Sequence, residues 1–174
     1  MDLSLVEREN TLLGQDFLTW LWYKTDNDNV LFQLEDKRTF SLQMEQKVSV
    51  QGGEGETKST ATVSSPGGEL DEAKAGLLTG KKVNKAQLLF TMDQDDWLLT
   101  VNAADFGLSG LKTPKVATKD EDGDDPDSKF LEKMFLVERC LEMFDIVFNE
   151  FLRLRMSRDW NEEAAKVKLW IGGQ

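Results

Sequence analysis

The side chains that most often carry out chemistry in proteins are scarce in this sequence. It contains no histidine, which excludes Ser-His-Asp and Cys-His catalysis and every His-ligated metal site. Cys140 is the only cysteine, which excludes an internal disulfide and argues against a thiolate zinc site. These residues therefore predict no catalytic residue, no metal site, no cofactor and no small-molecule substrate.

Carboxylates are the remaining groups that could support metal-dependent chemistry. Asp93, Asp95 and Asp96 are close enough in sequence to suggest a two-metal nuclease, which needs clustered carboxylates. They also lie in a predicted hairpin turn, where Asp is favoured because its short side chain hydrogen-bonds the local backbone. The turn is the stronger interpretation, so a metal-dependent nuclease is the least favoured function.

A second acidic group lies between Asp120 and Asp127 and invites comparison with a calcium-binding loop. Counted from Asp120, the sixth and twelfth positions are Asp125 and Leu131, where an EF-hand needs glycine and glutamate. The calcium pattern therefore fails. Because the acidic run contains no apolar residue, it predicts a flexible, solvated loop over residues 119–128.

Basic residues in two groups are the candidates for contact with DNA phosphates: Lys81, Lys82 and Lys85, and Arg153, Arg155 and Arg158. The lysines fall in a predicted connector, where they could equally be a solubilising loop. The arginines fall near the end of a long predicted helix, where cations also complement the helix dipole. DNA binding is favoured if both groups share one exposed face, and each phosphate contact would then add about −0.9 to the salt slope of affinity.

The overall charge limits the partners that this chain can attract. Asp and Glu number 32 against 21 Lys and Arg, which gives a formal net charge of −11. Such a surface repels nucleic acid and anionic membranes at long range and is typical of a soluble protein. No apolar run approaches the ~20 residues of a membrane span, and no secretion signal is visible. We therefore expect a cytoplasmic protein without a membrane partner.

The pattern of apolar residues predicts a mixed set of helices and strands. Helical periodicity covers residues 3–24 and 69–78, and alternation with period two covers residues 40–50, 86–92 and 97–101. Short strands are also expected at residues 30–34 and 57–64, the second of them at a sheet edge. The glycines and Pro114 predict an irregular segment over residues 106–114.

The longest predicted element is a helix from Ser128 to about Ser157. Its polar residues form one narrow stripe that includes Glu138, Glu142 and Asp145, and most other positions are apolar. So wide an apolar face predicts burial on most sides, against the sheet and against the first helix or a second subunit. A short C-terminal tail, residues 159–174, follows.

Together these elements predict a single α+β domain over residues 1–174. An antiparallel sheet of two hairpins, arranged as a meander, is expected to pack against the N-terminal helix and the long C-terminal helix. This arrangement leaves helix surface available for a partner.

Three stretches in this order are similar to a known family. They are Leu13–Lys24 (LGQDFLTWLWYK), the connector from Glu72-Ala73 to Gly80-Lys81-Lys82-Val83, and the hairpin Leu88–Phe90 and Trp97–Val101 before a long apolar helix. Over roughly Leu12 to Leu154 the chain resembles the C-terminal half of the recombination-associated protein RdgC. The resemblance implies an α+β fold and a homodimer that closes a ring around duplex DNA and restrains recombinase-driven strand exchange.

Two functional hypotheses come before the nuclease. The first is a non-enzymatic, cytoplasmic RdgC-like protein that is homodimeric, binds duplex DNA nonspecifically and modulates recombination. The alternative is a protein-interaction or oligomerisation module, of unknown role, that does not bind DNA. The negative charge and the apolar surplus on the long helix favour the alternative, while the family resemblance favours the first.

Overall fold

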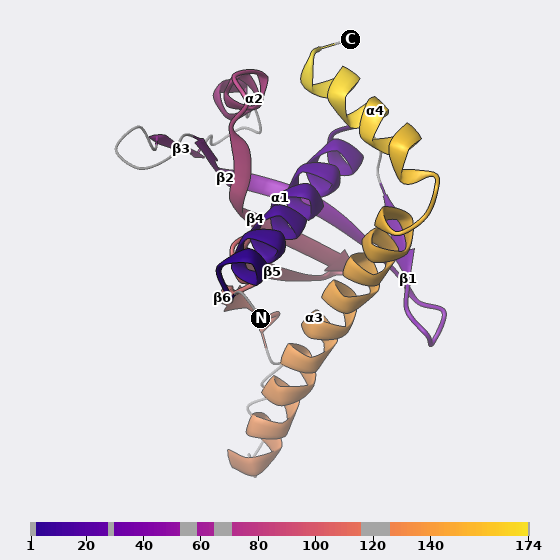
Figure 1. Ribbon diagram of the computed structural model, residues 1–174. Coiled ribbons are helices and arrows are strands. Elements are labelled where there is room, and N and C mark those ends of the chain that lie inside the picture. The colour runs from indigo at the N-terminus through magenta and orange to yellow at the C-terminus, as the bar shows by residue number, and fades with distance from the viewer. Residues whose placement is uncertain (1–2, 28–29, 53–58, 65–70, 116–125, 174) are drawn as a thin grey trace.

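Six antiparallel strands form one sheet in the computed structural model, which describes residues 3–27, 30–52, 59–64, 71–115 and 126–173 (Figure 1). The strands are β1 (Leu31–Gln33), β2 (Thr39–Gly52), β3 (Ser59–Ser64), β4 (Lys82–Met92), β5 (Asp95–Asn102) and β6 (Leu108–Lys112). Their spatial order is β1-β2-β4-β5-β6, with β3 pairing the opposite end of β2, on the same edge as β1. Together with the helices, this sheet confirms the predicted α+β fold.

The prediction for residues 106–114 is wrong. The segment expected to be irregular contains β6, which pairs with β5 through Leu98–Lys112, Thr100–Ser109 and Val101–Leu108. The register shifts between Leu98 and Thr100, and Gly110 has a φ of +61°. Glycine tolerates this left-handed backbone, so the same residue that signals a break in sequence accommodates an irregular edge strand.

Helix α1 (Leu3–Asn27) crosses one face of the sheet. The predicted helical periodicity of this segment is confirmed, because the apolar residues Phe17, Trp20 and Leu21 share its buried side and are at most 1 % exposed. They share a core with alternate residues of the central strands, among them Ala86, Leu88 and Phe90 of β4. Helix α2 (Asp71–Leu78) packs beside β2, where a Cβ on Gly76 would meet the side chain of Val50.

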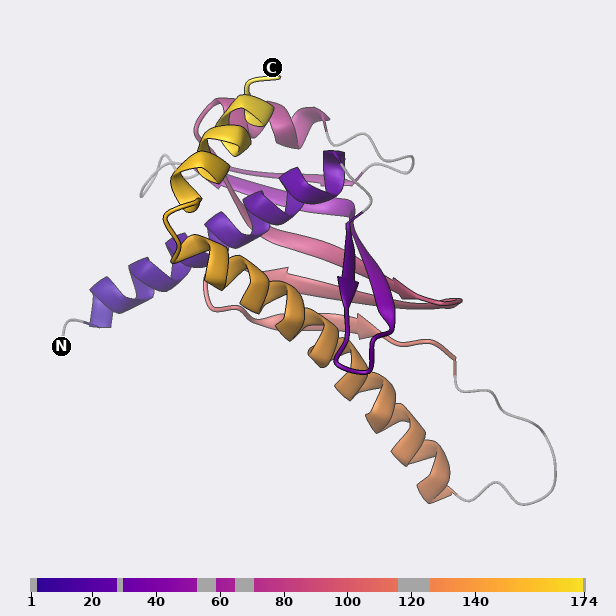
Figure 2. The ribbon, with the colours of Figure 1, turned by 90° about the vertical axis from the view of Figure 1, so that its right-hand side faces the viewer.

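Helix α3 (Pro126–Arg155) lies on the same side of the sheet as α1 but extends well beyond it (Figure 2). Its second half is buried through Cys140, Met143, Phe144, Val147 and Phe151. Within the chain itself, the sheet and α1 leave the first half largely exposed, so cover of this half by a second subunit stays a prediction. At about 1.5 Å per residue, a 30-residue helix is about 45 Å long and exceeds the sheet that it packs on.

The loop expected over residues 119–128 is only partly covered by the structure. Residues 119–125 lie outside the described residues, and residues 126–128 belong to the first turn of α3. The C-terminal tail forms helix α4 (Trp160–Ile171), which buries Val167 and Trp170. Trp170 packs edge-to-face on Trp22 of α1, with ring centroids 5.5 Å apart, so this tail is part of the core.

Candidate functional site

The predicted basic connector is largely a strand. Lys81 precedes β4 and its backbone N–H donates to the carbonyl of Gly76, whereas Lys82 and Lys85 lie within β4 itself. Lys82 and Lys85 are exposed. Because side chains alternate along a strand and Ala86 is fully buried towards α1, Lys85 points to the opposite face of the sheet.

The three arginines lie near the junction of α3 and α4. Arg153 and Arg155 are in the last turn of α3, where they complement the helix dipole, and Arg158 follows in the turn before α4. Arg155 alone reaches across to α1, since its Nε donates to Asp16 Oδ2 over 3.3 Å. Its guanidinium also lies over the ring of Trp160, 4.9 Å from the centroid.

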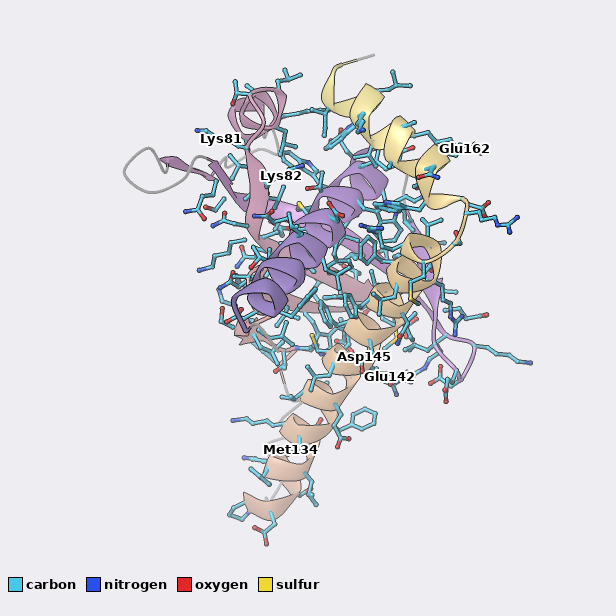
Figure 3. All side chains as sticks on the ribbon, viewed as in Figure 1. Lys81, Lys82, Met134, Glu142, Asp145 and Glu162 are labelled. Atoms are coloured by element: carbon cyan, nitrogen blue, oxygen red, sulfur yellow. The ribbon has the colours of Figure 1, made fainter. Side chains whose placement is uncertain are left out.

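One residue of the lysine group, Lys82, lines a small groove between α1, α4 and the start of β4. We call it the α1–α4 groove. Its lining includes Asp16, Thr19 and Trp20 of α1, Lys82 of β4, and Trp160 and Lys168 of α4, around a space of about 110 Å³. Asp16 of this lining accepts the hydrogen bond from Arg155, so the arginine group reaches the groove only through its pairing with Asp16. Figure 3 shows Lys82 beside Lys81 at the start of β4.

The six basic residues therefore do not form one surface. Lys85 faces away from α1, and Arg155 is already paired. Reasoning from sequence missed Asp16, Lys168 and Trp160 as their neighbours. The spacing of four and four in Trp160, Ala164 and Lys168 places these residues on one helical face and is the signal that could have grouped them.

A wider, acidic hollow of about 420 Å³ lies on the outer side of α3 beside the β1–β2 turn. Its carboxylates are Glu35, Glu138, Glu142 and Asp145, three of which belong to the predicted polar stripe. Figure 3 labels Glu142 and Asp145 on α3. Arg139 donates to Glu142 at 2.9 Å and lies 3.6 Å from Asp36. A hydrogen bond from Arg38 lowers the pKa of Asp36.

The carboxylates of the β4–β5 turn behave as the turn interpretation predicts. Asp93 takes a left-handed backbone with φ +57°, and Asp96 accepts a 2.7 Å hydrogen bond from the Thr91 hydroxyl. Within the residues that the structure describes, no group of three or more Asp, Glu or Cys side chains could hold a metal ion.

The most unusual surface of the molecule is the projecting part of α3, residues 126–141, which we call the arm. Five large apolar side chains are exposed along it: Phe130 62 %, Leu131 66 %, Met134 44 %, Phe135 54 % and Leu141 40 %. Figure 3 shows Met134 on this projecting part, away from the sheet. Clustered apolar surface of this kind marks an interaction site.

Cys140 lies where the arm meets the body, and it is fully buried. Burial raises the pKa of its thiol from 9.0 to about 11. We therefore expect iodoacetamide to alkylate the folded protein slowly at pH 8 and the urea-unfolded protein much faster, because the thiolate is the reactive form. Equal alkylation rates in both states would contradict this burial.

The folded thiol holds its proton more tightly, so the free energy of unfolding should fall as pH rises from 9.0 towards about 11.

Comparisons with known proteins give no relative, since no family model, no curated protein and no solved structure matches the chain. Among the helices of the described ranges, none is long and apolar enough to cross a lipid bilayer.

Proposed function

We propose that this protein is a non-enzymatic interaction module that self-associates through the arm of α3. The observation that carries the proposal is the exposure of four large apolar side chains on the part of α3 that extends beyond the sheet. Each is at least 44 % exposed: Phe130, Leu131, Met134 and Phe135. Exposing such side chains is unfavourable in water, by about 25 cal/mol for each Å² of apolar surface. A partner that covers the arm recovers this free energy.

The arm has the spacing that a second copy would match. Phe130, Met134, Val137 and Leu141 recur at intervals of four, three and four, which is the seam of a short coiled coil. Assigning these residues to alternating d and a positions puts Lys133 at a g position and Glu138 at an e position. When two arms pair in parallel along this seam, Lys133 of one copy lies beside Glu138 of the other. Both side chains are exposed.

The test is the oligomeric state of the full chain as a function of concentration, measured by sedimentation equilibrium. Met134→Glu places a charge in the seam of both copies, so the dissociation constant is expected to rise roughly a hundredfold. Met156→Glu is the matched control, because Met156 is 78 % exposed at the other end of α3 and lies off the arm. A monomer at every concentration, or equal effects of the two variants, would exclude this function.

Charge reversal tests whether the partner is a second copy. Lys133→Glu and Glu138→Lys should each weaken association by about fivefold, since exposed ion pairs contribute about 0.2–1 kcal/mol each. The double variant restores opposite charges and should return to the affinity of the unmodified protein. No rescue in the double variant would argue against this pairing of arms.

A second candidate function, nonspecific contact with duplex DNA in the manner of an RdgC-like protein, has one favourable observation. Lys82 lines the α1–α4 groove, and Arg155 pairs with Asp16 of the same groove. The resemblance to RdgC predicts both this contact and the homodimer, so the two candidates are compatible. Gel retardation of duplex and single-stranded DNA at two salt concentrations tests the second candidate, and absence of retardation at low salt would exclude it.

A further inference from the structure

We propose that the α1–α4 groove is a binding site for a phosphoryl group, held between Lys82 and Lys168. This inference does not depend on the arm. It proposes a phosphoryl group as the ligand of the groove. It also gives a binding role to Lys168, which is not among the residues predicted to contact DNA.

Lys82 and Lys168 differ from three neighbouring lysines of α1, α2 and α4 in that no carboxylate of the described residues neutralises them. Acidic residues outnumber basic ones, and nearby lysines are neutralised: Lys24 by Glu163 at 2.9 Å, Lys74 by Asp26 at 3.1 Å and Lys166 by Glu162 at 3.0 Å. Lys82 and Lys168 make no such ion pair with any residue in the described ranges, although both line the same groove.

The one carboxylate in the groove does not cancel these two charges. Asp16 is engaged by Arg155, whose Nε lies 3.3 Å from Asp16 Oδ2. Counting Asp16 and Arg155 as a neutral pair leaves two lysines facing the same space. A phosphoryl group carries about −1.5 to −2 at neutral pH, which matches two lysine charges better than a single carboxylate would.

The size and walls of the groove fit a small oxyanion. The space of about 110 Å³ is more than the minimum that a single water needs, so it can admit a small oxyanion. Trp20 and Trp160 form apolar walls, which lower the local dielectric and strengthen the attraction between lysine and oxyanion. Thr19 also lines the groove, but its hydroxyl donates to the Gln15 carbonyl, so the proposed binding rests on the two lysines.

Titration of the full chain with inorganic phosphate tests the site, with ¹H–¹⁵N NMR to locate the response and calorimetry to measure affinity. Shifts are expected at the groove, in residues 16–20, 82 and 160–171. Lys82→Gln and Lys168→Gln should each weaken phosphate binding by about tenfold, because each removes a charge-assisted contact. Lys112→Gln makes the same change of charge on the edge strand β6, where Lys112 is exposed, and should bind phosphate normally.

Titrations with two further ligands identify the source of the phosphoryl group. Adenosine monophosphate represents a free phosphate ester, and duplex DNA represents a phosphodiester backbone. If duplex DNA binds through the groove, Lys82→Gln should reduce the salt slope of its affinity by about one. If only phosphate and the nucleotide bind, the ligand is a small phosphate ester, and the site stands without DNA.

The proposal is overturned if phosphate produces no shifts at the groove, or if Lys82→Gln and Lys168→Gln bind as tightly as Lys112→Gln. Both substituted lysines are exposed, so these variants are expected to fold, and circular dichroism verifies that they do. The outcome is separate from that of the arm, because self-association is measured by sedimentation and does not involve the groove.

Discussion

Phe17→Ala is expected to lower the free energy of unfolding by about 3–5 kcal/mol, the range for truncating a large buried aromatic side chain. Phe17 is fully buried in the middle of α1. Four aromatic rings surround it, those of Phe106, Phe144, Phe148 and Phe151, with centroids 5.2 to 6.4 Å away.

The size of this effect follows from where those four rings come from. Phe144, Phe148 and Phe151 belong to the second half of α3, and Phe106 lies in the β5–β6 connection. Phe17 therefore joins three parts of the chain that are distant in sequence. Alanine leaves a cavity that none of the three elements can close without moving relative to the sheet, so little of the lost packing is recovered.

Urea denaturation followed by circular dichroism measures this loss. Leu12→Ala is a suitable control because Leu12 lies on the same helix but is 49 % exposed. It should cost less than about 1 kcal/mol, as surface substitutions usually do. Equal losses for the two variants would mean that α1 and α3 are not joined through Phe17.

The helix that carries Phe17 was predictable because its signal is local. The spacing of Phe17, Trp20 and Leu21 defines a stripe whatever it packs against, and all three residues are in the core. The hairpin of β4 and β5 was predictable for the same reason, since alternation with period two fixes which side chains point inward.

The part of α3 that would remain exposed was not predictable from its sequence. Phe130 and Phe144 are the same residue type on the same helix, yet one is 62 % exposed and the other 7 %. What separates them is the extent of the sheet and of α1 beneath α3, which is a tertiary property. Apolar periodicity indicates that a face must be covered, but it does not indicate whether the chain itself covers it.

Some residues in and around the α1–α4 groove were predictable from sequence, and others were not. Lys82 and Arg155 stood out because basic residues cluster locally in sequence. Asp16 and Lys168 did not, since a single acid on α1 and a single lysine on α4 gain meaning only when these helices lie together. Side-chain contacts across more than 130 residues, such as Arg155 with Asp16, cannot be derived from local patterns.

Gly14→Ala is expected to destabilise the protein by about 3 kcal/mol or more, at the upper end of the range for overpacking. Gly14 lies in α1 at the point where the helix meets the end of β5. A Cβ added there would overlap the carbonyl oxygen of Ala103 and lie only 2.7 Å from its carbonyl carbon. Backbone atoms cannot rotate away as a side chain can, so the helix or the strand end has to move.

Gly173→Ala separates this steric effect from backbone strain. Gly173 has a φ of +73°, which disfavours alanine, but no atom would lie within 4 Å of its new Cβ. The loss should stay within about 1 kcal/mol. Urea denaturation of both variants checks the difference, and a Gly14→Ala protein as stable as Gly173→Ala would show that α1 does not approach β5 so closely.

The close approach at Gly14 also bears on the groove. Asp16, Thr19 and Trp20 follow Gly14 within two turns of the same helix, whereas Lys82 is the lining residue that β4 holds. A shift of α1 away from Ala103 therefore moves three lining residues relative to Lys82. In Gly14→Ala, phosphate binding at the groove should weaken even under conditions where circular dichroism shows a folded chain. Unchanged phosphate affinity in a destabilised but folded Gly14→Ala protein would mean that α1 moves without altering the groove, or that the groove does not bind phosphate.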